Sequence, residues 1–179
     1  MKLTYRKATK RDLDALYFLA VQFTEFNAKK SGKRSKFFFK GWKKSFRKEI
    51  LEELSSFNST YFLAIDQDLV AESKDEAKRS SKNPKSKVPA AVSKNGTAIG
   101  YILGKRCKDL YYYCIDELFV LPKYRKLKAG KKLLKMAVKK GKSFGTPVRV
   151  EIFNWNENAK KFYLENGFKE DSIVFEYSN

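Results

Sequence analysis

Three acidic residues stand inside segments that otherwise have the apolar pattern of strands. Asp116 and Glu117 lie in YYYCIDELFVLP (111–122), and Glu151 lies in PVRVEIF (147–153). A buried carboxylate costs free energy unless it has a partner or a chemical role. The chain has no histidine, so a general base must be a carboxylate, a tyrosine, a lysine or water, and a histidine-based triad is excluded. The three acids are therefore candidate general bases, although each could instead pair with a neighbouring Lys or Arg.

The first two acids are adjacent in one predicted strand. Successive side chains of a strand point to opposite faces of the sheet. We therefore expect Asp116 and Glu117 on opposite faces, with at most one of them serving in a single site.

A second chemical feature is the segment KYRKLKAGKKLL (123–134), which carries six positive charges around one glycine. It lies where a strand pattern gives way to a helix pattern, and cations are placed unfavourably at the positive end of a helix dipole. A bound anion would account for them, because a turn followed by a helix N-terminus is a ready site for phosphate. The segment lacks the glycine and hydroxyl spacing of a P-loop and the three glycines of a dinucleotide fingerprint.

The net charge of +19 is concentrated in two blocks. Residues 29–48 and 123–142 each contain ten Lys or Arg and no acid, so the rest of the chain is close to neutral. An excess of solvated lysines explains part of this charge, but its confinement to two blocks indicates phosphate-bearing or acidic partners.

Other composition features narrow the class of protein. Without histidine or clustered thiols, the chain lacks the usual ligands for zinc or copper, and we expect no metal. No apolar run is long enough for a membrane span and no secretory leader is evident, so we expect a cytoplasmic protein without membrane contact. Cys107 and Cys114 could face each other across a hairpin, and we interpret them as reduced packing residues.

Hydrophobic periodicity predicts an alternation of strands and helices. Thr9 and Asp12 have the spacing of a capping box that opens a helix to about Asn27. A stripe of Phe38, Trp42, Phe46 and Ile50 predicts a second helix with a core face. A third helix is expected from Gly130 to about residue 140, and a fourth is capped by Asn156. Strands are predicted at 3–6, 60–66, 97–105, 111–122, 147–153 and 172–177.

One segment breaks this alternation. Residues 71–96 are rich in serine and charge and poor in large apolar residues, so we predict a mobile insertion in a hairpin. The length of 179 residues, 42% of them hydrophobic, otherwise suits one domain spanning 1–179.

The segments IDELFVLPKYRKLKAGKKLL and VEIFNWNENAKKFYLENGF, together with the opening YRKATKRDLDAL, resemble the GNAT superfamily of acyl-CoA N-acyltransferases. The resemblance spans nearly the whole chain in the right order. It implies a single-domain α/β (α+β) fold, in which helices flank a mixed, mostly antiparallel sheet. It also implies acetyl-CoA as co-substrate.

The resemblance further implies roles for individual residues. The loop that donates backbone amides to the cofactor pyrophosphate would contain Arg125, Lys126, Lys128, Ala129, Gly130 and Lys131, with Lys128 where the family has its first glycine. Leu118, Phe119 and Val120 would pair with the pantetheine arm, and Asn156 would lie near the cofactor. Tyr163 matches the general acid of the family. Glu151 matches the catalytic glutamate of some protein N-terminal acetyltransferases, and Asp116 an acid of the polyamine acetyltransferases.

These features together predict an N-acetyltransferase that acts by direct attack of a primary amine on acetyl-CoA. By the same resemblance the basic block 29–48 would lie where acceptors enter, which favours a protein or peptide amine in an acidic or nucleic-acid-associated protein over a polyamine. The alternative is a non-catalytic module of the same fold that docks on RNA or the ribosome through its basic blocks.

Overall fold

The computed structural model describes residues 1–31, 42–69, 92–93, 96–107 and 111–172. Its strands are β1 (Leu3–Lys7), β2 (Ser59–Asp66), β3 (Val92–Ser93), β4 (Gly96–Cys107), β5 (Tyr112–Val120) and β6 (Val148–Val150). Its helices are α1 (Leu13–Ser31), α2 (Trp42–Ser55), α4 (Ala129–Lys142) and α5 (Glu157–Leu164), with short 3-10 helices η1 (Lys10–Asp12) and η2 (Pro122–Leu127).

The strands form one sheet in the order β1-β2-β4-β5-β6, and β3 pairs with β4 off this path. All pairs are antiparallel except β5 with β6, which is parallel. This confirms the predicted mixed, mostly antiparallel sheet flanked by helices.

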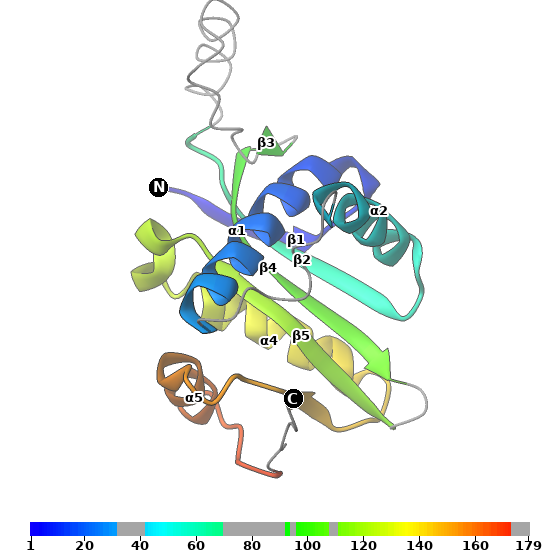
Figure 1. The fold of residues 1–179 in the computed structure, drawn as a ribbon, viewed down its shortest axis with the longest axis vertical. Helices are drawn as coiled ribbons and strands as arrows, with labels where there is room; N and C mark the ends of the chain where they lie inside the picture. The colour runs from blue at the N-terminus through cyan, green and yellow to red at the C-terminus, as the bar shows by residue number, and fades with distance from the viewer. Residues whose placement is uncertain (32–41, 70–91, 94–95, 108–110, 173–179) are drawn as a thin grey trace, which may run out of the picture.

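Helices cover both faces of the sheet (Figure 1). On one face α1 and α2 pack on the strands, with Leu16, Ile50 and Tyr101 fully buried in a shared core. On the other face α4 and α5 pack on a second core, which contains Leu133 and Tyr163. Residues that alternate along a strand therefore belong to different cores, and each functional side chain can be assigned to one face.

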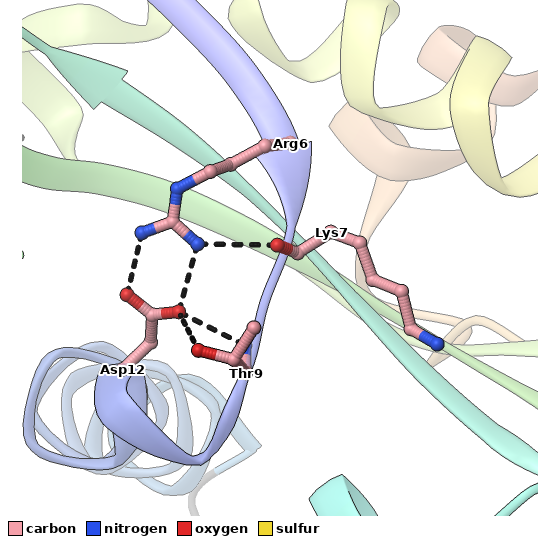
Figure 2. Close-up of polar contacts among 4 residues, drawn as sticks. All are labelled: Arg6, Lys7, Thr9 and Asp12. Atoms are coloured by element: carbon pink, nitrogen blue, oxygen red, sulfur yellow. Dashed lines mark hydrogen bonds and ion pairs between the residues drawn. The ribbon is translucent and has the colours of Figure 1, made fainter.

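The junction between β1 and α1 is fixed by a polar cluster, shown in Figure 2. The Thr9 backbone N–H donates to Asp12 Oδ2 at 2.9 Å, and the Arg6 guanidinium donates to both Asp12 oxygens at 2.6 and 2.8 Å. Burial alone would raise the pKa of Asp12, but the bonds from Arg6 and Thr9 outweigh it and lower that pKa. The capping role of Asp12 is confirmed, and Arg6 is a partner that the sequence pattern did not reveal.

Several predicted boundaries need correction. The first helix ends at Ser31 rather than near Asn27. The strand predicted at 147–153 has only the three residues of β6. Val92 and Ser93 pair with Thr97 and Gly96, so the predicted insertion 71–96 ends in a short hairpin. The rest of that insertion (apart from Gly96), Phe38 and most of the predicted strand 172–177 lie outside the described residues.

No helix in the described ranges has the length and apolar character that a membrane span requires. In those same ranges, His, Cys, Asp and Glu side chains do not gather into a group of three or more that could hold a metal ion.

Candidate functional site

Strands β5 and β6 separate after a short stretch of pairing. Tyr113 pairs with Val148 and Ile115 with Val150, where β6 ends, while β5 continues to Val120. In the described part of the chain, no strand pairs with the β6-side edge of β5 beyond Ile115. The β6-side edge of β5 at Leu118, Phe119 and Val120 is therefore open to an extended ligand within the described residues.

The segment after β5 places amides and cations at the end of this opening. η2 leads into α4, whose first backbone bond runs from the Lys132 N–H to the Lys128 carbonyl at 3.1 Å. Helix geometry leaves the amides of Ala129, Gly130 and Lys131 without an acceptor four residues earlier. Lys126, Lys128, Lys131 and Lys132 are exposed around them. The arrangement fits a phosphate-bearing ligand.

Lys128 keeps the backbone conformation that a glycine would have there. Its φ is +57° and its ψ is +15°, the left-handed region. Lys128 therefore adopts a backbone conformation that favours glycine, and its side chain adds an exposed ammonium to the loop. The cost is backbone strain, since a side chain is disfavoured in this region.

Arg125 and Gly130 connect the segment 125–131 to the rest of the fold. Arg125 Nε donates to the Val120 carbonyl at 3.2 Å, and its guanidinium lies 5.4 Å from the ring centre of Phe26 in α1. Gly130 faces Phe162 of α5, whose ring would lie 3.7 Å from an added Cβ. The loop is thus held between β5, α1 and α5.

The expected opposite orientation of Asp116 and Glu117 is wrong, because β5 contains a bulge. Leu103 pairs with Glu117 and Gly104 pairs with Ile115, so Asp116 has no partner residue in β4. Ile115 packs in the core beneath α4, and Phe119, two residues after Glu117, packs in the core beneath α1 and α2. The extra residue therefore turns both carboxylates toward α1 and α2.

Both carboxylates belong to a polar network on that face. The Tyr101 hydroxyl donates to Glu117 Oε2 at 2.5 Å, and the Tyr61 hydroxyl donates to Glu53 Oε2. Lys105 Nζ lies 2.6 Å from Glu53 Oε1 and 2.5 Å from Asp116 Oδ2. The network thus joins α2, β2, β4 and the bulge of β5.

Glu117 is the acid in this network with the most unusual electrostatics. Burial raises the pKa of its carboxyl to about 7, and the charges of Asp116 and Glu53 raise it as well. The Tyr101 hydroxyl and the Lys105 ammonium oppose this increase. A carboxyl that changes its charge near neutral pH is suited to accept a proton from a substrate.

Glu151, the third candidate base, lies elsewhere. β6 ends at Val150, so Glu151 follows the strand and is exposed, where the sequence pattern predicted a strand interior. Its charge helps to raise the pKa values of Tyr112 and Cys114. Because the Glu151 carboxylate is exposed, its charge carries no desolvation cost, and burial gives no reason to assign it a catalytic role.

Tyr163 and Asn156 come from α5, on the α4 face. Tyr163 is 8% exposed and contacts Phe162 and Phe168 edge to face. Burial raises the pKa of its phenol, and the nearby Cys114 of β5 adds to this effect. Asn156 Oδ1 accepts from the Ala159 N–H at 3.2 Å, so the predicted helix cap is confirmed. Tyr163 therefore stays protonated near the point where β5 and β6 separate.

Three of the six described Lys and Arg residues in the basic block 29–48 form ion pairs with acids, among them Lys48 with Glu52 within α2. Lys43 Nζ lies 2.9 Å from Glu25 Oε1, and Arg47 Nη1 lies 2.6 Å from Asp14 Oδ1. These pairs join α2 to α1. Within the described residues, no ion pair involves a lysine of the block 123–142, which therefore presents more uncompensated charge.

Sequence reasoning missed Glu53, Tyr61, Tyr101 and Lys105. These residues are far apart in the chain, and only the pairing of β2, β4 and β5 brings them together. One signal was available: Gly104 inside a strand pattern is typical of a bulge or a close contact. A Cβ at Gly104 would lie 2.1 Å from the Tyr113 hydroxyl oxygen.

The chain matches the model of the acetyltransferase (GNAT) family over residues 36–168. A search of curated protein sequences found no significant match.

Solved structures share the fold at low sequence identity. The aminoglycoside acetyltransferase AAC(6')-Iy, in complex with the bisubstrate analogue CoA-S-monomethyl-acetylneamine, gives a TM-score of 0.66 at 16% identity and covers 100% of this chain and 99% of its own. PaiA N-acetyltransferase from Thermoplasma acidophilum, in complex with coenzyme A, gives 0.66 at 22% identity, with coverage of 97% and 94%. AAC(6')-Ig from Acinetobacter haemolyticus gives 0.64 at 15% identity, with coverage of 98% and 97%.

Proposed function

The chain belongs to the acetyltransferase (GNAT) family, and on this premise we propose that it transfers an acetyl group from acetyl-CoA to a primary amine. We further propose that the whole chain 1–179 is one such domain and that it works in the cytoplasm. The free thiols of Cys107 and Cys114 are consistent with a reducing compartment.

One observation carries the proposal. The edge of β5 where β6 ends has at one end a loop of exposed lysines and helix N-terminal amides and, next to the bulge, a carboxyl whose pKa is about 7. An acyl-CoA substrate needs the first feature and an amine acceptor needs the second.

Acetyl-CoA would be held by backbone and by charge. Leu118, Phe119 and Val120 would bond its pantetheine arm, and the amides of Ala129, Gly130 and Lys131 would bond its pyrophosphate. Arg125, Lys126 and Lys128 would supply positive charge, and Asn156 would border the site from α5. The structure supports this assignment because the left-handed backbone of Lys128 leaves the loop amides in place.

The chain's residues would then move two protons. Acetyl-CoA supplies a thioester, and the attacking amine must be neutral although it is mostly protonated at pH 7. We assign Glu117 as the base that takes the amine proton, directly or through water, with Asp116 and Glu151 as alternatives. As the N–C bond forms and the C–S bond breaks, Tyr163 gives its proton to the departing thiolate.

Direct attack is favoured over a covalent enzyme intermediate. Cys114 is the cysteine near Tyr163, and burial raises the pKa of its thiol to about 12. A thiol with this pKa is almost entirely protonated at neutral pH and is a poor nucleophile.

For the acceptor we propose an amine on a protein or peptide. Glu53, Asp116 and Glu117 outnumber Lys105 beside the bulge, which suits an ammonium at the reaction centre. The exposed lysines of the block 123–142 suit acidic groups farther out. An amine within an acidic or nucleic-acid-associated protein would suit both the acids beside the bulge and the exposed lysines. A bare polyamine would suit only the acids.

The test is an acetyl-transfer assay that follows thiol release with a panel of acceptors: spermidine, an aminoglycoside, an acidic peptide and a basic peptide, at low and moderate salt. We expect turnover of the acidic peptide that declines with salt. Tyr163→Phe should lower kcat more than it weakens acetyl-CoA binding, because the proton is needed in the transition state. Efficient, salt-insensitive turnover of spermidine would contradict the acceptor proposal.

The alternative, a non-catalytic module that docks on RNA or the ribosome, rested partly on Lys128. Its left-handed backbone weakens that argument, while the exposed lysines of α4 still favour a polyanionic partner. The same preparation separates the two. Absence of acetyl-CoA binding by thermal shift, together with RNA binding that falls steeply with salt, would favour the module.

A further inference from the structure

Lys105 lies between α2 and β5, two elements that are far apart in the sequence. It lies in β4, and its ammonium contacts both Glu53 of α2 and Asp116 of the β5 bulge within 2.6 Å. Its side chain is 34% exposed, so these pairs are partly shielded from water. Burial would lower the pKa of Lys105, but its bonds to the two carboxylates outweigh that effect and raise the pKa.

The surroundings of Glu117 explain why this position matters. The charged and titratable groups that act on it are Asp116 beside it in β5, Glu53 from α2, and Tyr101 and Lys105 from β4, while Tyr61 of β2 is in turn affected by its charge. Lys105 is the one cation among them. Two carboxylates next to a third would otherwise favour its protonated form.

The bulge gives Lys105 a second task. Asp116 has no partner residue in β4, so its backbone lacks the register that pairing normally imposes. The ion pair with Lys105 links the Asp116 side chain to β4, and the ion pair between Lys105 and Glu53 links both to α2. The orientation of Glu117, the next residue, depends on that bulge.

We propose that Lys105 is a positioning residue of the acyl-transfer site: it holds the bulge through Asp116 and Glu53, and its positive charge favours the ionised form of Glu117. This inference rests on the proposed function and assigns a role to a residue that does not touch the reacting atoms. It makes the protonation of Glu117 depend on a side chain twelve positions earlier in the chain.

The test combines the pH dependence of kcat/KM with an NMR titration of carbon-13-labelled glutamate, in which Glu117→Gln identifies the Glu117 signal. Lys105→Met should move both midpoints up by about one pH unit, which lowers kcat/KM about tenfold below the midpoint and little well above it. Lys105→Arg should keep the wild-type midpoint. Lys160→Met is the matched control: it breaks the exposed ion pair between Lys160 of α5 and Glu170, and it should change neither midpoint.

A sign test covers the case in which Lys105→Met does not fold. Glu53→Gln removes a negative charge and should move the Glu117 midpoint down, in the opposite direction. A midpoint that is unchanged in every variant, or a loss of rate that is equal at all pH values, would overturn the inference. These results are distinct from failure of the proposed function, which would appear as a wild-type protein that acetylates no amine.

Discussion

Lys128→Gly offers a direct test of backbone strain in the loop that precedes α4. Lys128 has a φ of +57°, and no side-chain cap bond compensates for this backbone at the start of α4. A residue with a Cβ costs about 1–2 kcal/mol in the left-handed region. Glycine avoids this cost but loses about 0.5–1 kcal/mol more conformational entropy on folding.

The two effects differ enough to predict a sign. Lys128→Gly should stabilise the fold by about 0.5–1 kcal/mol, which for a chain of this size raises Tm by roughly 1–4 °C. Lys128→Ala is the matched control, because it also removes the ammonium but keeps a Cβ in the left-handed backbone. It should therefore give no gain in stability.

The assay is urea unfolding of the three proteins, followed by circular dichroism, together with their acetyl-CoA affinities. Both variants should bind acetyl-CoA more weakly if the ammonium contacts phosphate, and by similar factors. Equal stability of the Gly and Ala variants would refute the claim that the loop is strained at this position.

Three further predictions concern other parts of the fold. The raised pKa of Glu117 means that the folded state binds its proton more tightly than the unfolded state, so stability is lost as pH rises from about 4.5 to 7. Glu117→Gln should thus be more stable than wild type by up to about 3 kcal/mol at about pH 8 and nearly equal at about pH 4, with acetyl transfer strongly reduced. Asp12→Asn should cost about 1.5–3 kcal/mol in urea unfolding, because Asp12 is 2% exposed and the substitution weakens its charge-assisted hydrogen bonds from Arg6 and Thr9. Gly104→Ala should cost about 1–3 kcal/mol in thermal unfolding, because the added Cβ meets the Tyr113 hydroxyl.

Each of these has a result that would contradict it. A stability difference between Glu117→Gln and wild type that does not depend on pH would remove the titration argument. The lowered pKa of Asp12 implies that wild type, but not Asp12→Asn, loses this contribution as pH falls below the usual value for Asp; parallel acid unfolding would count against it. Gly130→Ala is the control for Gly104→Ala, since its Cβ would meet ordinary contacts at 3.7 Å, and equal losses would argue against a steric cause.

The sequence predicted the elements better than it predicted the site. Periodic apolar residues marked the helices α1, α2 and α4 and the central strands, because each of these elements buries one face or both. Asn156 as a cap and Asp12 in a capping box were also confirmed, since their bonds are local in the chain. The strand predicted at 147–153 is longer than β6, because an apolar pattern does not reveal where a strand stops pairing with its neighbour.

The acid cluster was less predictable for a physical reason. Alternation along a strand correctly separates neighbouring residues unless a bulge intervenes, and the bulge at Asp116 depends on pairing with β4. Glu53, Tyr61 and Lys105 meet only through α2 packing and the sheet register. These two contacts link residues 8 and 52 positions apart in the chain, and local propensity does not reveal either of them.

The positions that cost stability lie around one opening in the sheet. Lys128 has a left-handed backbone just before α4, Glu117 has a carboxyl whose charged form is disfavoured, and β5 gives up its regular pairing at Asp116. Local strain and buried charge persist when surrounding structure enforces them, and they concentrate where ligands bind and react. Since α4, α5 and the Lys105 network each fix one of these positions from a different element, the fold can maintain an edge of β5 that is unpaired within the described residues. The same edge is what an extended acyl-CoA substrate requires.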